Sequence, residues 1–247
     1  AHKANRNTVS GSRKNIAAHY DLSNDFFSLF LDPTMMYSAA VFRDQTQTLH
    51  EASTAKLTHI CERLQLKPSD HLVEIGTGWG GMAIHAAKHY GCRVTTTTIS
   101  QQQYEYTRQR IAEEGLEDRI ELLMSDYRDL QGKYDKLVSI EMIEAVGEEN
   151  WPDYFKTVHD RLKPGGTAAI QAITIAERDF ETYKAYPDFI QRYIFPGGML
   201  LTKTVMKEAA SRVGLVLEAT DCFRLDYART LRAWSKRFIE RWDTIAK

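Results

Sequence analysis

The clearest chemical signal in the sequence is a glycine-rich turn that contains Gly76, Gly78 and Gly80. An apolar strand expected at residues 71–75 runs directly into this turn, and a helix is expected at residues 82–90. Glycine permits positive φ and carries no Cβ, so the backbone can come close to a ribose or a methionine group. The spacing is Gly-x-Gly-x-Gly and lacks the third glycine of the dinucleotide fingerprint, which favours S-adenosylmethionine over NAD. A tight structural turn is the alternative.

Polar residues also follow the neighbouring strands of the same predicted sheet. Ligands of an open α/β sheet lie beyond the carboxyl ends of its strands, so these positions are candidates for a site. Thr98 and Gln103 follow the second strand, where an acidic residue commonly binds ribose hydroxyls and Gln103 is the expected substitute. Asp126 and Tyr127 follow the third strand and suit the adenine amino group and ring. Asp126 could equally cap the next turn.

Two carboxylates follow the fourth strand. Glu144 lies among Ile143, Ala145 and Val146, where an unpaired charge would be expensive to bury. We therefore expect Glu144 to have partners or a function. Glu141 is compatible with a plain surface position, which makes Glu144 the better candidate.

The elements that must position these residues form an α/β pattern. Strands are expected at residues 71–75, 93–99, 120–124, 136–140, 167–173 and 216–221. Helices of ordinary length are expected between the strands from residue 93 to residue 173, as in right-handed βαβ crossovers, so we expect a mostly parallel sheet with helices on both faces. Residues 162–166 end a helix and lead into the fifth strand. Residues 174–196 form a longer insertion near a strand end, where insertions tend to be functional.

Two apolar stripes at helical spacing flank this pattern. The first stripe consists of Leu22, Phe26, Leu29 and Phe30. The second consists of Leu231, Trp234, Phe238, Trp242 and Ile245. Both are expected to pack on the core, and a lid over an apolar substrate is the alternative.

Composition is that of a globular enzyme with one main domain. The 247 residues are 43% hydrophobic and 26% charged, with no run long enough to span a bilayer. The net charge is −1, yet both ends are basic. The basic residues are Lys3, Arg6, Arg13 and Lys14, then Arg229, Arg232, Lys236, Arg237 and Arg241. They could meet an anionic surface, although solvated charge is the commoner meaning. Three scattered cysteines, Cys61, Cys92 and Cys222, indicate a reduced, cytoplasmic protein, and no metal-ligand cluster is evident.

Several motifs together resemble the cyclopropane fatty-acyl-phospholipid synthases over nearly the whole chain. Besides the glycine turn, they are residues 19–22, 30–38, 98–103, 126–130, 144–147 and 193–196. The resemblance implies a class I, Rossmann-like methyltransferase fold that adds a methylene bridge across a cis double bond of a phospholipid acyl chain. It also implies a set of residues that contact S-adenosylmethionine. These are Tyr20, Ser38, Glu74, Gly76, Gly78, Thr98, Gln103, Asp126 and Tyr127.

That reaction makes physical demands on a site. An alkene is a weak nucleophile, so the sulfonium methyl must be held in line with the π bond, away from water. Methyl transfer leaves a carbocation, which aromatic faces can stabilise by roughly 0.5–2 kcal/mol each. Candidate aromatic residues are Tyr20, Phe26, Phe27, Tyr37, Phe42 and Tyr193. Ring closure then needs a base close to the new methyl group.

In the family that the chain resembles, the base is thought to be bicarbonate. Its expected ligands here are Glu144, Tyr227, Gln171 and Ile173, where Gln171 stands in place of a histidine. Ala39 stands in place of a cysteine. Glutamine can still donate a hydrogen bond to an anion, but an alanine side chain cannot. An altered bicarbonate site is therefore expected.

We divide the chain, as one catalytic domain, into a helical lead-in (1–65), a cofactor-binding core (66–173), an insertion (174–201) and a C-terminal strand and helix (202–247). Relatives continue beyond this helix, so the end is expected to be truncated. The expected partner is a phospholipid surface with unsaturated acyl chains, bound peripherally at the inner face of the membrane. No nucleic acid is expected, and a homodimer is left open. The alternatives are an enzyme that forms methyl or methylene branches, a small-molecule N-methyltransferase, and a non-catalytic cofactor- or lipid-binding module.

Overall fold

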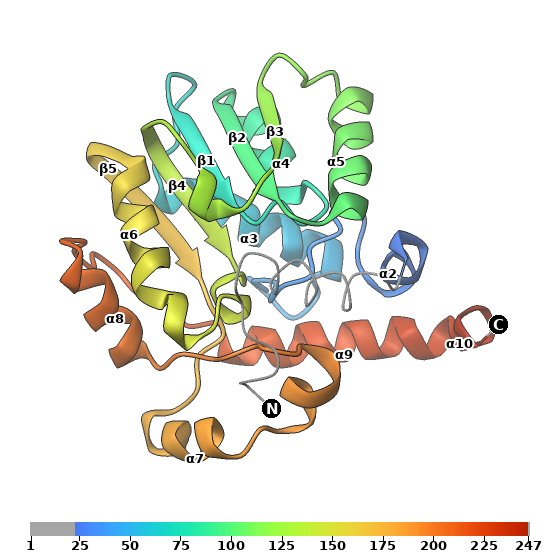
Figure 1. Cartoon of the computed structure of the whole chain (residues 1–247). Helices are drawn as coiled ribbons and strands as arrows, with labels where there is room; N and C mark the ends of the chain where they lie inside the picture. Colours follow the sequence, from blue (N-terminus) through green and yellow to red (C-terminus); the bar gives the residue numbers. More distant parts are fainter. Residues whose placement is uncertain (1–22, 247) are drawn as a thin grey trace.

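The computed structural model describes residues 23–246, and its centre is a five-stranded parallel sheet (Figure 1). The strands are β1 (His71–Ile75), β2 (Arg93–Thr98), β3 (Ile120–Met124), β4 (Tyr134–Ile140) and β5 (Leu162–Gln171). Their order is β3-β2-β1-β4-β5, so β1 pairs with β2 on one side and β4 on the other. The order reverses at β1, which is where an open α/β sheet binds its ligand. The predicted parallel sheet is confirmed.

Alternate residues of the strands pack on opposite faces of the sheet. Leu72 and Val138 join the core under the helices α3 (Leu49–Arg63), α4 (Gly81–Tyr90) and α5 (Gln101–Glu113). Val73 and Leu137 join the core under α6 (Trp151–Arg161) and α8 (Lys203–Arg212). Local signals start the first group of helices. Thr48 and Glu51 form a capping box for α3, and the Ser100 hydroxyl caps α5.

A third group of helices lies across the carboxyl ends of the strands. α9 (Arg224–Glu240), followed by α10 (Trp242–Ile245), runs below the sheet in Figure 1, and α2 (Asn24–Phe30) lies against it. Phe27, Phe30 and Trp234 form the buried centre of this contact together with Trp79 from the glycine turn. The insertion contains α7 (Phe180–Ala185) and a π-helical turn at Ile190–Ile194. The candidate site therefore lies between the sheet and α9.

The prediction of a strand at residues 216–221 is wrong. This segment pairs with no strand of the described chain, and β5 is the edge of the sheet. Val216 is 84% exposed and Leu217 is 55% exposed. Apolar alternation alone does not make a strand, because the backbone also needs a neighbour with which to exchange hydrogen bonds. The helix expected between β3 and β4 is also wrong, because only a 3-10 turn at Tyr127–Asp129 separates these strands. Smaller differences concern boundaries: β2 ends at Thr98, β4 begins at Tyr134, and β5 spans Leu162–Gln171 with a register irregularity near its start.

The second apolar stripe packs only in part. Trp234 is buried and Phe238 packs against the same cluster, whereas Leu231 and Trp242 are about half exposed. In the first stripe, Leu22 lies outside the described residues, and Phe26 and Phe30 pack as expected. All three cysteines are free, and only Cys222 is exposed.

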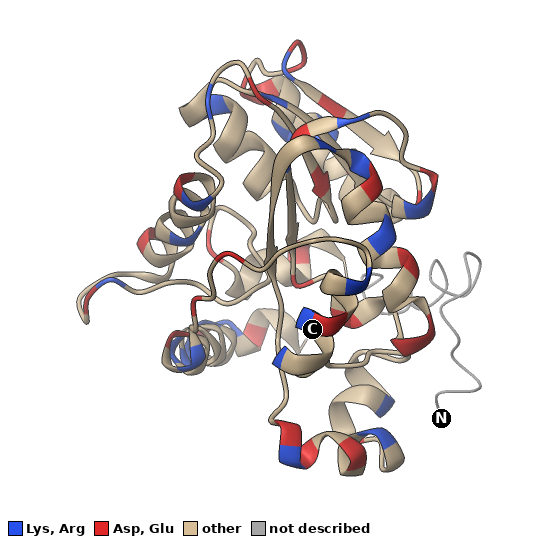
Figure 2. Ribbon diagram, turned by 90° about the vertical axis from the view of Figure 1, so that its left-hand side faces the viewer, with Lys and Arg blue, Asp and Glu red and all other residues tan. Residues whose placement is uncertain are grey.

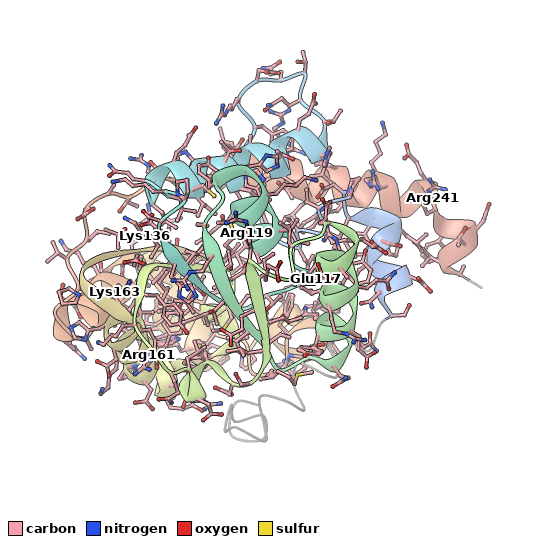
Figure 3. All side chains as sticks on the ribbon, turned by 90° about the horizontal axis from the view of Figure 1, so that it is seen from above. Glu117, Arg119, Lys136, Arg161, Lys163 and Arg241 are labelled. Carbon is pink, nitrogen blue, oxygen red and sulfur yellow. The ribbon has the colours of Figure 1, made fainter. Side chains whose placement is uncertain are left out.

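Charges of both signs are interspersed over the surface (Figure 2). Figure 3 shows the molecule from the top of Figure 1 and labels the cations Arg119, Lys136, Arg161 and Lys163. Arg241, also labelled, lies at a distance from these four. The first four lie near the amino ends of strands, and each has a hydrogen-bond or ion-pair partner within the chain. Within residues 23–246, no helix combines the length and hydropathy needed to cross a membrane.

Candidate active site

The glycine turn opens onto free space at the carboxyl end of β1. Gly76, Gly78 and Gly80 all have positive φ, at 95°, 54° and 84°. A Cβ built on Gly78 would meet no atom within 4 Å, whereas one on Gly80 would lie 2.7 Å from Thr107 Cγ2. Gly80 is therefore required by packing, and Gly78 leaves the turn open toward a ligand. This cradle fits the methionine and ribose part of S-adenosylmethionine.

Glu74 supports the turn from within the sheet. It is 2% exposed, and its Oε2 accepts a hydrogen bond of 2.7 Å from the Thr96 hydroxyl. That hydroxyl also lies 2.7 Å from the Thr77 hydroxyl in the turn. Burial raises the pKa of Glu74 to about 8, against the opposing effects of Thr96 and Lys56. The carboxyl group thus anchors the turn through Thr96.

Thr98 and Gln103 lie together after β2, as expected. The Thr98 hydroxyl donates to Gln103 Oε1 at 3.0 Å, and both side chains are buried. The amide nitrogen of Gln103 makes no hydrogen bond to the part of the chain that is described. Its N–H groups are therefore available for a ribose hydroxyl.

The structure shows Asp126 in its capping role. Its carboxylate accepts from the backbone N–H of Arg128 at 3.0 Å and from the guanidinium at 2.8 and 2.7 Å. The ring of Tyr127 packs against Tyr154, with centroids 5.7 Å apart, and the Arg128 guanidinium lies 5.4 Å from its centroid. An aromatic ring is thus fixed at the end of β3, where adenine is expected.

Glu141 is not the plain surface residue that was compatible with the sequence. Its Oε1 accepts two hydrogen bonds of 2.8 Å, from the Ala39 backbone N–H and from Gln171 Nε2. Its own N–H donates to the Gln171 carbonyl, and its φ is +47°, which is rare for a residue with a side chain. Burial raises the pKa of this carboxyl, whereas Ala39, Lys56 and Gln171 lower it. The only sequence signal for Glu141 was its place in the segment that follows β4. Glu144 lies in the same segment, so this signal did not distinguish the two residues.

Glu144 lies next to Glu141 and is held differently. Its Oε1 accepts from the Ile173 N–H at 2.5 Å, while its Oε2 is buried without a hydrogen-bond partner among the described residues. Burial, together with the charge of Glu141, raises the pKa of Glu144 to about 8. The Glu144 carbonyl accepts from the Met199 N–H at 2.8 Å, which ties the insertion to the site.

Sequence reasoning missed Lys56, which supplies the positive charge of the site. Lys56 is fully buried on α3, and its Nζ lies 2.5 Å from the Ser38 hydroxyl. Burial lowers its pKa to about 8, and Glu141, Asp32 and Glu74 oppose this effect. Ser38, an expected cofactor contact, is thus a hydrogen-bond partner of Lys56. Tyr20, another expected contact, lies outside the described residues.

Aromatic side chains line the side of the site that faces α9. Tyr37 contacts the rings of Phe27, Phe195 and Trp234 at centroid distances of 5.4, 6.3 and 5.2 Å. Burial and the nearby Glu141 raise the pKa of Tyr37 to about 12. Burial also raises the pKa of Tyr227, and the carboxylates Glu141 and Glu144 add to this effect. The aromatic lining is therefore neutral and rich in π faces.

Three of the donors expected to hold bicarbonate are already used by protein carboxyl groups. The Ala39 N–H and the Gln171 amide already donate to Glu141, and the Ile173 N–H already donates to Glu144. A charged Glu141 in this space would repel another anion. The structure therefore places protein carboxylates where the resemblance implied bicarbonate.

Comparison with known proteins shows the family of the chain. Residues 8–247 match the family model described as mycolic acid cyclopropane synthetase. The tuberculostearic acid methyltransferase UfaA1 of Mycobacterium tuberculosis is 41% identical over 95% of this chain, and the cyclopropane-fatty-acyl-phospholipid synthase of Escherichia coli is 40% identical over 92%. The chain spans 57% of the length of each of these relatives.

Solved structures show the same architecture. The cyclopropane synthase MmaA2 of Mycobacterium tuberculosis superposes with a TM-score of 0.87 at 32% identity, covering 93% of this chain and 84% of that one. The mycolic acid cyclopropane synthase CmaA1, in complex with SAH and CTAB, gives 0.88 at the same identity and coverage. The chain therefore has the class I methyltransferase fold and belongs to the mycolic acid cyclopropane synthetase family, whose members include S-adenosylmethionine-dependent lipid methyltransferases.

Proposed function

We propose that the chain catalyses methyl transfer from S-adenosylmethionine to the cis double bond of an unsaturated phospholipid acyl chain, with a cyclopropane as product. The single observation that carries this proposal is the enclosed cluster of Glu141, Glu144, Gln171 and Tyr227 beside the aromatic lining. Such a cluster combines a proton acceptor with a surface that tolerates a carbocation. Membership of the family supports the same reaction.

The glycine turn, Gln103 and Tyr127 are the proposed contacts of S-adenosylmethionine, with Gln103 on the ribose and Tyr127 near adenine. When bound, S-adenosylmethionine supplies an electrophilic sulfonium methyl group. Holding the alkene in line with that methyl group converts a bimolecular encounter into an oriented step. The proposed role of Tyr37 and its neighbouring rings is to exclude water and face the cation with π electrons.

The base decides the product. In the cyclopropane reaction, the π electrons form the bond to the incoming methyl carbon, and a proton then leaves that methyl group as its C–H electron pair closes the ring. The resemblance implies bicarbonate as the acceptor, but the donors present do not fit it, so no step is routed through bicarbonate here. A side-chain carboxylate is the alternative acceptor.

A second candidate product is a methyl- or methylene-branched acyl chain. A methylene branch forms when a hydride shifts from the methylated carbon to the cationic carbon and a base then removes a proton from the transferred methyl group. A saturated methyl branch also requires a hydride donor. The observation that favours this candidate is the similarity to a relative named as a tuberculostearic acid methyltransferase, at 41% identity.

The proposed partner is an anionic phospholipid surface, met reversibly from the cytoplasmic side. Arg232, Lys236 and Arg241 on α9 and α10 are exposed and lie near the candidate site's end of the sheet. Arg229 and Arg237 instead donate to backbone carbonyls of the chain, so they serve its packing. Lys3, Arg6, Arg13 and Lys14 lie outside the described residues. Exposed Phe189 and Tyr193 on the insertion add apolar area of the kind that enters a lipid interface.

The proposed reaction is tested with two matched vesicle preparations that differ only in one cis double bond per acyl chain. We expect S-adenosylhomocysteine to accumulate with the unsaturated vesicles and to stay at background with the saturated ones. Equal accumulation with both would contradict an alkene substrate. Proton NMR of the released acyl chains would then decide between cyclopropane and methylene-branched products, which have the same mass.

A further inference from the structure

We propose that the carboxylate of Glu141 is the base of this reaction and occupies the place of a bound bicarbonate. The inference rests on the proposed function, because it names the proton acceptor of that same site. It begins with two departures at one location. Ala39 stands where a cysteine is expected and Gln171 where a histidine is expected, and both contact the same Glu141 oxygen.

The hydrogen bonds of Glu141 hold one oxygen and leave the other open. Oε1 accepts from the Ala39 N–H and from Gln171 Nε2, each at 2.8 Å. Oε2 accepts no hydrogen bond from residues 23–246, and it is not among the sealed polar atoms of the structure. The carboxylate is therefore oriented by fixed donors while a lone pair remains for an incoming proton. A general base needs this combination of fixed position and free acceptor.

The surrounding charges favour Glu141 over Glu144 as the base. Burial raises the pKa of Glu141, and the Ala39 N–H, the buried cation Lys56 and the Gln171 amide oppose this effect. Glu144 has only the Ile173 N–H in addition to its own backbone, and the Glu141 charge favours its protonated form. Two carboxyl groups at close range whose environments differ in this way take separate roles. We assign the base to Glu141, whose Oε1 is held by two fixed donors, and not to Glu144, which has one donor from another residue, the Ile173 N–H.

The backbone of Glu141 has a conformation that is uncommon for a residue with a side chain. Its φ of +47° suits glycine, yet the residue carries a long acidic side chain at the carboxyl end of β4. Strained conformations persist where the surrounding structure fixes them, and they concentrate at functional sites. The hydrogen bond from the Glu141 N–H to the Gln171 carbonyl, 2.8 Å long, fixes this one.

The proposed step removes a proton from the transferred methyl group and closes the ring. The alkene π pair has formed a bond to the transferred methyl carbon, and the sulfur has kept the electron pair of the broken C–S bond. Oε2 of Glu141 then takes one proton from that methyl group, and the C–H pair closes the cyclopropane ring onto the cationic carbon. Glu141 becomes a neutral carboxylic acid and returns its proton to water after the product leaves.

The competing explanation is a purely structural role, in which Glu141 only ties the Ala39 segment to Gln171. Glu141→Gln separates the two, because the amide oxygen can still accept both hydrogen bonds but cannot act as a base. We expect Glu141→Gln to keep its thermal transition and S-adenosylmethionine affinity by calorimetry, and to lose about 10²–10⁴-fold in kcat. Glu149→Gln, the same change at an exposed position, is the matched control and should keep full activity.

A second variant tests the place of the anion. Glu141→Gly suits the positive φ and releases the Ala39 N–H and the Gln171 amide. In buffer depleted of carbon dioxide, we expect added bicarbonate to leave the wild-type rate unchanged and to raise the rate of Glu141→Gly. Binding of ¹³C-labelled bicarbonate, followed by NMR without lipid or turnover, should be seen for Glu141→Gly and absent for the wild type.

Two outcomes would overturn the inference: a wild-type protein that binds bicarbonate and needs it for turnover, or a Glu141→Gln variant with wild-type kcat. These differ from a failure of the proposed function. In that case no wild-type S-adenosylhomocysteine would form with any unsaturated phospholipid, while the NMR comparison would still report whether Glu141 occupies the anion position.

Discussion

Replacement of Glu144 by glutamine should stabilise the protein at alkaline pH. The pKa of Glu144 is raised from its ordinary value of 4.5 to about 8, because the carboxyl group is buried beside Glu141. A carboxyl whose pKa is higher in the folded state than in the unfolded state favours folding only in its protonated form. Its destabilising effect is therefore absent below pH 4.5 and grows as the pH rises toward 8. Glutamine stays neutral and avoids this penalty.

The magnitude follows from the two pKa values. At 1.36 kcal/mol per pKa unit, ionisation of Glu144 above pH 8 costs roughly 4–5 kcal/mol of folding free energy. The glutamine side chain can still accept from the Ile173 N–H, but its amide nitrogen takes the place of the unpartnered Oε2. That buried donor costs about 1–3 kcal/mol at every pH, so only the change with pH isolates the carboxyl group.

The assay is urea unfolding of wild type and Glu144→Gln at pH 5 and pH 9. We expect the free energy of unfolding of the variant, relative to wild type, to rise by about 3–4 kcal/mol between the two values. Glu149→Gln, which changes an exposed carboxylate, should show no such rise. A difference between wild type and Glu144→Gln that does not change with pH would refute the burial argument for Glu144.

Three further predictions follow from other parts of the site. Gly78→Val places a β-branched residue at positive φ beside the open cradle. Calorimetry should show S-adenosylmethionine affinity reduced at least about tenfold, with near-normal circular dichroism. Unchanged affinity would contradict the cofactor position. Lys56→Met removes the buried cation and should lower the free energy of unfolding by about 3–5 kcal/mol, whereas a neutral result would show that its carboxylate neighbours need no charge partner. In a co-sedimentation assay, binding to anionic vesicles through Arg232, Lys236 and Arg241 should weaken by about 1 kcal/mol for each cation removed, and it should also weaken as salt rises. Equal binding to neutral vesicles at all salt concentrations would exclude this electrostatic contact.

The part of the fold that local pattern determines could be predicted from the sequence. The apolar strands, the glycine turn and the capped helices gave the parallel sheet and the edge where the site lies, because each depends on neighbours within a few residues. The segment at residues 216–221 shows the limit of that reasoning. Its alternation is suitable for a strand, but pairing depends on a partner strand elsewhere in the chain.

The sequence indicated where the candidate site lies but not which side chains set its charge. The resemblance grouped Glu144, Gln171, Ile173 and Tyr227; the structure joins Ile173 to Glu144 by a hydrogen bond and Gln171 to the neighbouring Glu141. The role of Glu141 depends on a hydrogen bond to Ala39, 102 residues away in sequence. Local spacing carries no record of such a contact.

Lys56 lies on a helix, where its type and position indicate a solvated side chain, and only the tertiary structure buries it between carboxylates. The residues that set the charge of this site are therefore those for which sequence spacing gives the least information.

Isotopic analysis of the lipid product tests the central claim most directly. The wild-type protein is incubated with S-adenosylmethionine carrying a fully deuterated methyl group and with a phospholipid that has one cis double bond, and the acyl chains are examined by mass spectrometry. Ring closure by a base near the methyl group predicts a saturated, cyclopropane-bearing chain that retains two of the three deuterium atoms. A methylene-branched chain has the same mass as the cyclopropane and is recognised because its proton NMR spectrum lacks the upfield C–H signals of the ring. That product, a methyl-branched chain that retains all three deuterium atoms, or an unmodified lipid would contradict the account.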